Sequence, residues 1–312
     1  MKKILITGGA GFIGSHIADK MLAHNYHVRI YDNLSTGKMA NILPIKDHIE
    51  FIESDIRNYD QLSKAMKGCD LVFHEAAEVS VPKTIKSPIE TTMINDIGTL
   101  NVFESARQAN VQRVIFASSC AIYGDSPELP KHEQMLPQPK SPYAAQKMMG
   151  EYYARLYHDL YQLETVCLRY FNVYGPRQDP SSPYSGVISI FLTKALEKQS
   201  PTIYGDGNQS RDFVFVQDVV NANLLAGTQK DVSGNVYNIG TGKSRSINDL
   251  WQTICQKATI NITAKYDQGR FGDVIASVGD IQKANQELHY YPEFLFEEGL
   301  QFTLDWYQMI SH

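Results

Sequence analysis

Short apolar runs alternate with helical patterns along the first half of the chain. The first run, residues 4–6, is uniformly apolar, as in a strand that is buried on both faces. Later apolar runs predict strands at 28–31, 51–53, 71–73, 114–117 and 165–168, and helical spacing predicts helices at 58–67, 87–109 and 143–161. Repeated strand–helix units with right-handed crossovers predict an α/β fold, a Rossmann-type doubly wound parallel sheet with helices on both faces.

The regular alternation ends near residue 170. Beyond it, stretches rich in Pro, Gly and Tyr separate shorter helices, which we predict at 187–198, 217–227, 246–258 and 295–309. We therefore predict a cofactor-binding domain over 1–170, with part of 212–243 returning to it. A smaller C-terminal α/β domain over 171–312 is expected to close over a substrate.

Glycines follow the first predicted strand at Gly8, Gly11 and Gly14, and a helical pattern begins after them. A strand, a glycine turn and a helix form the context in which a backbone approaches a pyrophosphate at a helix N-terminus. The second strand ends at Asp32, whose carboxylate suits an adenosine ribose and repels a 2′-phosphate. These residues favour NAD over NADP; the alternative is an ordinary turn with structural glycines.

Composition narrows the class of protein further. The chain has 312 residues, 43% of them hydrophobic and 20% charged, with a net charge of −5. These values are typical of a globular protein and argue against a nucleic-acid surface. We expect no signal peptide and no membrane span, since a strand begins at residue 3 and no apolar run is long enough. Four scattered cysteines predict free thiols and a cytoplasmic location; no metal site is predicted.

The most informative stretch for chemistry is residues 141–147. Ser141 and Pro142 form a helix start, and Tyr143 and Lys147 then lie one turn apart on the same helix face. A phenol has an ordinary pKa of about 10, and a nearby ammonium with the positive nicotinamide of NAD⁺ favours the phenolate. Ser119, at the end of a predicted strand, offers a hydroxyl to the same substrate oxygen. The alternative is an aromatic residue packed beside a solvated lysine.

With these motifs the chain resembles the extended short-chain dehydrogenases/reductases, and among them the nucleotide-sugar 4-epimerases related to UDP-galactose 4-epimerase. The resemblance covers essentially the whole chain. It implies that Ser119, Tyr143 and Lys147 are catalytic, with Tyr143 as the acid and base. It also implies NAD as cofactor, bound by Gly8, Gly11, Phe12, Ile13, Gly14, Asp32, Asn33, Asp55, Ile56, Ala76, Ala77, Asn95, Tyr143, Lys147 and Tyr170.

The same resemblance implies a UDP-sugar substrate. The segment 169–177 is similar to the family segment after the sixth strand, and 205–213 and 270–273 match its other nucleotide-binding segments. Their implied roles are phosphate contacts, ribose contacts and a uracil neighbour. The implied substrate-binding residues are Ser80, Ser119, Asn172, Tyr204, Arg211, Arg270, Asp273 and Ser277. Two arginines also suit a diphosphate chemically, because the guanidinium fork engages phosphate oxygens in pairs.

The residues after Ser119 discriminate among reactions. Related 4,6-dehydratases place Asp-Glu there and related decarboxylases place a Glu, whereas this chain has Cys120 and Ala121. Neither side chain supplies a carboxylate, so the sequence favours epimerisation through a transient 4-keto sugar. Cys120 is interpreted as a small buried thiol rather than a nucleophile. Glu75 stands where the family more often has a hydrophobic residue, and the sequence assigns it no role.

Ser277 is informative about which sugar the enzyme accepts. The resemblance places it where epimerases restricted to UDP-glucose and UDP-galactose have a bulky tyrosine. The smaller serine leaves room for a 2-acetamido group. Ser80 to Lys83 also resembles the branch that accepts N-acetylated sugars. We therefore expect interconversion of UDP-GlcNAc and UDP-GalNAc, alongside UDP-glucose and UDP-galactose.

Other classes stay open at this point. A UDP-glucuronate epimerase, a dehydratase, a decarboxylase or a ketoreductase could use the same scaffold, since a fold does not choose a reaction. A non-catalytic NAD-binding regulator is a different class, which would be expected to lack the Tyr143 and Lys147 pair. Helices 87–109 and 143–161 carry apolar and aromatic residues beyond the needs of one sheet face. In the family such helices pair across a dimer, so we expect a homodimer.

Overall fold

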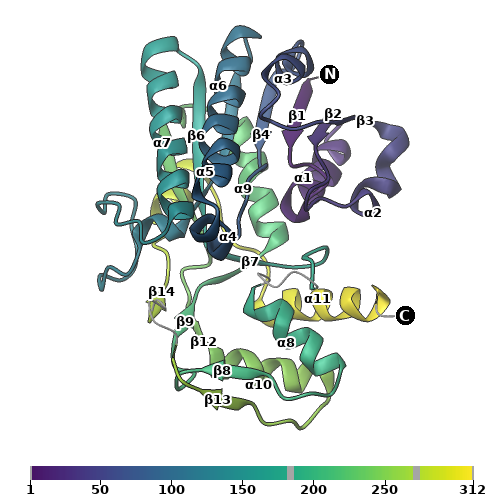
Figure 1. The fold of residues 1–312 in the computed structure, drawn as a ribbon, viewed down its shortest axis with the longest axis vertical. Helices are drawn as coiled ribbons and strands as arrows, with labels where there is room; N and C mark the ends of the chain where they lie inside the picture. The colour runs from purple at the N-terminus through teal and green to yellow at the C-terminus, as the bar shows by residue number, and fades with distance from the viewer. Residues whose placement is uncertain (1, 181–185, 270–274, 311–312) are drawn as a thin grey trace.

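A seven-stranded parallel sheet forms the centre of the larger part of the molecule (Figure 1). The computed structural model describes residues 2–180, 186–269 and 275–310. The strand order is β11-β6-β5-β4-β1-β2-β3, and every neighbouring pair is parallel. The strands are β1 (Lys3–Thr7), β2 (His27–Asp32), β3 (Ile49–Glu53), β4 (Leu71–His74), β5 (Arg113–Ser119), β6 (Glu164–Tyr170) and β11 (Asn235–Ile239). The predicted doubly wound fold is confirmed.

Helices cover both faces of this sheet. α1 (Phe12–Ala23) packs beside α9 (Val216–Thr228) on one face, and α3 (Tyr59–Met66), α6 (Gly98–Gln108) and α7 (Pro142–Tyr161) pack side by side on the other (Figure 1). Alternate residues of each strand feed the two cores, because successive side chains point to opposite faces. In β4, Phe73 belongs to the core under α1 and α9, while Val72 belongs to the core under α3, α6 and α7.

The helix predicted over 87–109 is built from three pieces. α5 (Pro88–Thr92) continues through a π-helical turn, η2 (Met93–Ile97), into α6. The shorter elements of the larger part are α2 (Met39–Ile42), η1 (Leu43–His48), α4 (Val81–Lys86) and η3 (Cys120–Tyr123). A π-helical turn widens the helix locally and is found frequently at functional sites.

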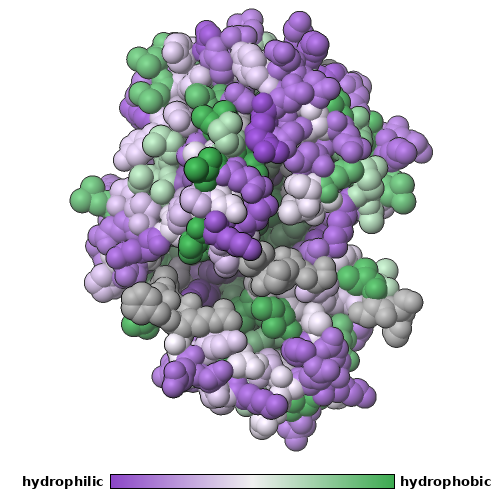
Figure 2. Space-filling model, viewed as in Figure 1, coloured by the Kyte–Doolittle hydropathy of each residue, from purple (hydrophilic) through white to green (hydrophobic). Residues whose placement is uncertain are grey.

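Short strands make up the smaller part of the molecule together with the helices α8 (Val187–Leu196), α10 (Ile247–Ala258) and α11 (Phe296–Ile310). β8 (Thr202–Tyr204) pairs with β13 (Lys265–Asp267), and β9 (Ser210–Arg211) lies between β12 (Arg245–Ser246) and β14 (Ala276–Ser277). β7 (Asn172–Tyr174) pairs with β10 (Phe213–Phe215), and η4 (Ala284–Leu288) follows later. Figure 2 shows a hollow between the two parts.

The chain passes between the two parts more than once. After β7 and α8 it returns through β10 and α9 to the large sheet, where β11 forms the edge strand beside β6. The carboxyl ends of the strands face the smaller part (Figure 1), which is where ligands bind in open α/β sheets. The domain boundaries proposed from the sequence stay a prediction. Among the described residues, no helix has the length and apolar character needed to span a membrane.

Candidate active site

The glycine turn between β1 and α1 forms a cradle lined by backbone. Gly8 has a φ of 70°, and a Cβ atom there would lie 2.7 Å from the Ala76 nitrogen. A Cβ at Gly14 would lie 2.9 Å from the Gly9 Cα. Gly11 is the N-cap of α1 and provides no capping side chain, and the first turn has no acidic residue. The backbone N–H groups at this helix start are therefore available to a pyrophosphate, which fits NAD.

Asp32, the last residue of β2, borders this cradle. Its carboxylate accepts hydrogen bonds from the backbone of Ala10 at 2.9 Å and of Leu34 at 2.8 Å. Burial raises the pKa of Asp32. Because a carboxylate has about four acceptor sites, two bonds leave capacity for the ribose hydroxyls that the sequence assigned to it.

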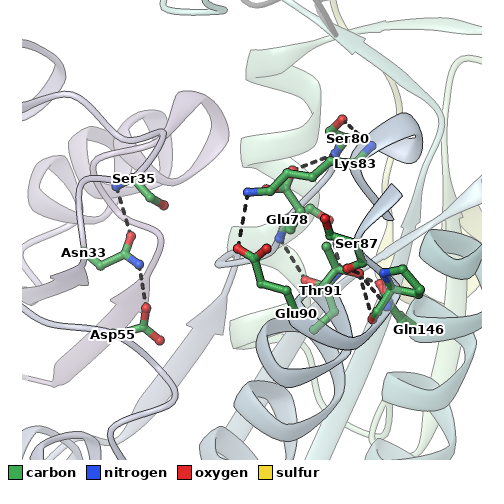
Figure 3. A network of polar contacts seen from close by, with 12 residues as sticks. Asn33, Ser35, Asp55, Glu78, Ser80, Lys83, Ser87, Glu90, Thr91 and Gln146 are labelled. Atoms are coloured by element: carbon green, nitrogen blue, oxygen red, sulfur yellow. Dashed lines mark hydrogen bonds and ion pairs between the residues drawn. The ribbon is translucent and has the colours of Figure 1, made fainter. Parts of the chain in front are cut away.

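Asn33 and Asp55 lie together across the ends of β2 and β3 (Figure 3). The Asn33 amide donates to Asp55 at 2.7 Å, and the Arg57 guanidinium donates to both Asp55 oxygens at 2.8 Å. The hydrogen bonds from Arg57 lower the pKa of Asp55 to about 2, so this carboxylate is ionised at neutral pH. Ile56, the next residue, is buried against Gly98.

Three predicted catalytic side chains meet where β5 ends and α7 begins. Ser141 caps α7 by accepting the Ala144 N–H at 3.2 Å, which fixes the first turn of the helix. The Ser119 hydroxyl lies near the Tyr143 phenol and lowers its pKa. The Lys147 ammonium donates to the Ala117 carbonyl at 2.7 Å and lies 5.9 Å from the centre of the Tyr143 ring.

Burial dominates the electrostatics of this trio. It raises the pKa of Tyr143 to about 12, and the phenol therefore holds its proton in the structure. Burial also lowers the pKa of Lys147 to about 8, while its ammonium is hydrogen-bonded to the strand β5. In both cases desolvation disfavours the charged form. That Lys147 and the nicotinamide of NAD⁺ together favour the phenolate stays a prediction.

A hydrogen-bond network fixes the segment between β4 and α4 against α7 (Figure 3). Asn95 accepts the Glu78 N–H at 2.8 Å and donates both to the Glu78 carbonyl and to Gln146. Glu78 accepts the Ser80 N–H and pairs with Lys83 at 2.8 Å. Both amide protons of Asn95 are thus used within the protein, so it positions this segment, and its contact with the cofactor stays a prediction.

Several other predicted cofactor residues border the same strand ends. Phe12 and Ile13 form the first turn of α1, and Ala76 and Ala77 follow β4. The Ala76 N–H donates to the Thr7 hydroxyl at 3.3 Å. Tyr170 ends β6, and its ring belongs to the core under α9.

On the substrate side, the short strands bring distant residues together. Ser277 in β14 is the register partner of Arg211 in β9. Burial raises the pKa of the Cys120 thiol to about 12, and the nearby Ser277 hydroxyl lowers it by a smaller amount. Cys120 is therefore a neutral thiol beside Ser277, as a structural rather than nucleophilic cysteine would be.

Other predicted substrate residues lie around this point. Asn172 in β7 donates to the Asp212 carbonyl at 3.3 Å, and Tyr204 ends β8. The Ser80 hydroxyl caps α4 by accepting the Lys83 N–H at 3.1 Å and retains its own proton for a ligand. Arg270 and Asp273 lie outside the described residues.

Sequence reasoning missed two residues that hold the site together. Asp212, between β9 and β10, accepts the N–H groups of Thr241, Gly242 and Gly279 and so ties two loops to the substrate strands. Glu75, directly after β4, accepts the Tyr170 hydroxyl at 2.8 Å. The sequence did single out Glu75, because the family more often has an apolar residue at this position. It did not reveal which residues Glu75 contacts.

Comparison with known proteins settles the family. The model of the NAD dependent epimerase/dehydratase family matches residues 4–240, which is most of the chain. The chain belongs to this family. The match spans the glycine cradle, the serine–tyrosine–lysine trio and the return of the chain to the large sheet.

Relatives match over almost the whole length. A protein from Methanocaldococcus jannaschii named as a putative UDP-glucose 4-epimerase is 45% identical, over 97% of each chain. A solved UDP-N-acetylglucosamine 4-epimerase from Methanobrevibacter ruminantium, in complex with UDP-N-acetylmuramic acid, has a TM-score of 0.95 at 41% identity and covers 99% of both chains. A solved UDP-glucose 4-epimerase from Thermotoga maritima, with UDP-glucose, has a TM-score of 0.95 at 37% identity and covers 99% of this chain and 100% of its own.

These comparisons confirm the family that the sequence motifs resembled. They also confirm NAD as the cofactor and the assignment of the chain to the isomerases. The glycine cradle, with its uncapped helix N-terminus and Asp32 beside it, fits NAD independently of any relative.

Proposed function

We propose that this protein interconverts the C4 epimers of UDP-sugars, with UDP-GlcNAc and UDP-GalNAc as its main pair and UDP-glucose and UDP-galactose as a further one. The observation that carries the proposal is the hydroxyl pair of Ser119 and Tyr143 beside the buried Lys147 ammonium, at the carboxyl end of β5. The relatives named as UDP-glucose and UDP-N-acetylglucosamine 4-epimerases support the reaction.

In this proposal the chain supplies proton transfer and positioning. Tyr143 takes the proton of the sugar O4 hydroxyl and later returns it, while Ser119 holds the same oxygen through a hydrogen bond. NAD, which the glycine cradle and Asp32 would hold, would supply the acceptor and donor of the hydride at C4 of the sugar. A cation near the phenol lowers the cost of the phenolate, so Lys147 must keep its proton for Tyr143 to act as a base.

The sugar has to turn while the nucleotide stays in place. We assign Arg211 and Asn172 to the diphosphate and Tyr204 to the uracil end, with Arg270 and Asp273 as further predicted anchors. Ser80, Ser119 and Ser277 are small groups toward the sugar. Weak contacts to the hexose let its two faces be presented in turn, while charged hydrogen bonds to the diphosphate hold the substrate.

The choice of an N-acetylated sugar rests on Ser277. Its neighbour is the Cys120 thiol, and both side chains are small, so a 2-acetamido group would meet little bulk and a hydroxyl donor. Elimination of water or loss of carbon dioxide is disfavoured because Cys120 and Ala121 follow Ser119 where a carboxylate would be needed.

Anomeric proton NMR on purified enzyme tests this function directly. The protein is incubated separately with UDP-GlcNAc, UDP-glucose and UDP-glucuronate, without added reductant. Formation of UDP-GalNAc, with slower formation of UDP-galactose, is the expected result. Conversion of UDP-glucose alone would contradict the role given to Ser277, and conversion of UDP-glucuronate alone would identify a uronate epimerase instead.

We also propose a homodimer that buries the outer faces of α5, η2 and α7. Tyr152, Leu156 and Leu160 on α7 are exposed, as are Ile89 and Met93 on the neighbouring helical stretch. Tyr153 and Tyr157, which are among the aromatic residues of the predicted helix 143–161, pack instead into the core under α6. Because η2 contacts both α5 and α7, these exposed apolar residues lie on neighbouring elements, and exposed apolar groups of this kind mark protein–protein contact.

A further inference from the structure

Glu75 is a carboxylate that the proposed mechanism leaves unused. It follows β4, and its N–H donates to the Thr7 carbonyl at 3.1 Å. The register of β4 and β5 pairs His74 with Phe116, so Glu75 comes next to Ala117. The Ala117 carbonyl accepts the Lys147 ammonium at 2.7 Å. The backbone of Glu75 therefore lies one strand away from the anchor of the proposed catalytic lysine.

A relay of hydrogen bonds fixes the carboxylate from the side of α9. The Asn223 amide donates to the Tyr170 hydroxyl at 2.7 Å, and that hydroxyl donates to Glu75 Oε1 at 2.8 Å. Asn223 is itself held by the Val219 carbonyl at 2.9 Å. Because a phenol has one proton, the direction of this relay is fixed and Glu75 is its acceptor. The second oxygen, Oε2, has no hydrogen-bond partner within the described part of the chain.

Among the described residues, the charged and titratable groups that act on Glu75 come from α7, β6 and β4. Lys147 and Tyr143 on α7 interact with it electrostatically, Tyr170 donates a hydrogen bond from β6, and His74 precedes it in β4. His74 bonds Thr7 and Thr99, and burial lowers its pKa to about 3, so it is neutral. Lys147 is thus the cation that acts on Glu75 among these groups.

The two charges depend on each other. Burial raises the pKa of Glu75 to about 7 and lowers that of Lys147 to about 8, while each charge opposes the loss of the other. An ammonium buried without an anion gives up its proton more readily, because desolvation penalises its charged form. Removing the carboxylate would therefore move Lys147 further toward the neutral amine.

We propose that Glu75 is a positioning residue whose carboxylate, held by Tyr170, keeps Lys147 in the ammonium form during proton transfer by Tyr143. The inference rests on the proposed function, since that function assigns Lys147 to the catalytic pair. A neutral Lys147 would remove the cation beside the Tyr143 phenolate and slow catalysis.

The pH profile of the NAD-loaded enzyme tests this role. Glu75→Gln removes the charge and keeps an acceptor oxygen for Tyr170. The alkaline limb of its kcat profile is expected to move toward acid by about one pH unit, with KM for the UDP-sugar little changed. Asn223→Ala is the matched control, because it breaks the relay behind Tyr170 and leaves both charges in place. Its alkaline limb should stay at the wild-type pH.

Two outcomes would overturn the proposal. One is a Glu75→Gln enzyme with the wild-type alkaline limb; the other is an equal displacement in Asn223→Ala, which would mean that packing alone is responsible. If Glu75→Gln is inactive at every pH, the proposal is tested by the melting temperatures of the NAD-loaded wild type and Glu75→Gln, measured between pH 5 and pH 8.

The pKa of Glu75 determines how the difference in melting temperature between the two proteins should change with pH. The pKa of Glu75 is higher in the fold than in an unfolded chain, so the wild type loses stability as pH rises through about 7. The melting temperature of Glu75→Gln relative to wild type should therefore increase from pH 5 to pH 8. A constant difference would overturn the proposal. A wild type that converts no UDP-sugar would contradict the proposed function instead, and the melting comparison would still report on Glu75.

Discussion

Tyr143, the proposed acid and base, lies where burial raises its pKa to about 12. A free phenol in that state is a weak base at neutral pH, so the proposed mechanism depends on the groups near it. The Lys147 ammonium lies 5.9 Å from the centre of the Tyr143 ring, and the Ser119 hydroxyl lowers the pKa of Tyr143. At the residue scale, the proposed proton transfer therefore depends on a few buried groups.

Replacing Tyr143 by Phe should lower kcat by about 10²–10⁴-fold, the usual contribution of a general acid–base group. KM for the UDP-sugar should change little, because the diphosphate anchors are elsewhere. Conversion of UDP-GlcNAc followed by anomeric proton NMR checks this. Tyr161→Phe, the same change on the same helix at a half-exposed site, is the control. Equal activity of both variants would show that Tyr143 does not carry the proton.

Replacing Ser277 by Tyr should restrict the substrates of the enzyme to UDP-hexoses that lack an N-acetyl group. The larger ring would fill the space beside Cys120 and exclude a 2-acetamido group. The ratio of kcat/KM for UDP-GlcNAc to that for UDP-glucose should fall by at least tenfold. Ser277→Ala is the control, because it removes only the hydroxyl. A ratio that does not change in Ser277→Tyr would mean that the N-acetyl group binds elsewhere.

Several site residues could be predicted at this scale and others could not. Ser119, Tyr143 and Lys147 followed from a strand end and a one-turn spacing, both of which are local features. The contacts of Glu75 and Cys120 were hidden, because their partners Tyr170 and Ser277 are 95 and 157 residues away. Sheet register decides such contacts.

At the scale of elements, the turn from β1 to α1 combines two requirements. The backbone must leave the strand sharply, and it must also come close to the residues after β4. Gly8 meets both requirements. It adopts a positive φ, and it has no Cβ atom, which would lie only 2.7 Å from the Ala76 nitrogen. A helix start without a capping side chain then exposes its N–H groups to an anion.

Gly14→Ala should abolish NAD binding. The added Cβ would collide with the backbone of Gly8 and Gly9, which cannot move away as a flexible side chain can. The cradle would therefore open and the helix start would leave the pyrophosphate. NAD binding by titration calorimetry on apo-protein is the measurement. Gly186→Ala, whose Cβ would meet only the Gln178 amide at 3.5 Å, should bind NAD normally. Undiminished binding in Gly14→Ala would exclude this turn as the pyrophosphate site.

The long elements were predictable and the short ones were not. Buried strands and helices such as β5 and α7 carry a periodic pattern that reports their burial. β9, β12 and β14 have two residues each, which is too short for any pattern. They form because Arg211 has both Ser277 and Arg245 as register partners from distant segments, and these strands carry two of the proposed substrate contacts.

At the scale of the whole molecule, the exposed apolar surface on α5, η2 and α7 predicts a second copy of the chain. Leu156→Glu places a charge on a side chain that is 49% exposed in one subunit, so the fold should tolerate it. Light scattering after size-exclusion chromatography should show a dimer for the wild type and a monomer for the variant. Met309→Glu, at a 76% exposed site on α11, should leave the dimer intact. A wild-type monomer would contradict the proposal.

Acid should weaken the junction that His16 forms. Its Nε2–H donates to the Pro176 carbonyl at 2.9 Å, and Nδ1 accepts the Gln217 amide at 3.3 Å, so α1, α9 and the segment after β7 are joined. Burial lowers the pKa of His16 from 6.5 to about 4. Because the fold favours the neutral imidazole, His16 contributes its full stabilisation above pH 6.5. This contribution is lost as the pH falls through about 4.

The expected loss is about 3 kcal/mol, at 1.4 kcal/mol per pH unit. It should appear in urea unfolding between pH 6.5 and pH 4, and His16→Gln should lack it. His24→Gln, an exposed histidine at the end of the same helix, should behave as wild type. The same pH dependence in His16→Gln and wild type would assign the acid sensitivity to other groups.

Local patterns in the chain were enough to predict the doubly wound sheet, the glycine turn after β1, NAD as the cofactor, and the one-turn spacing of Tyr143 and Lys147. These are local properties, set by side-chain periodicity and by residues within one or two turns of each other. The pKa of Tyr143, the neighbours of Ser277 and the charge environment of Lys147 emerged only in the folded molecule. Burial and strand register create these properties, because both depend on segments that are distant along the chain.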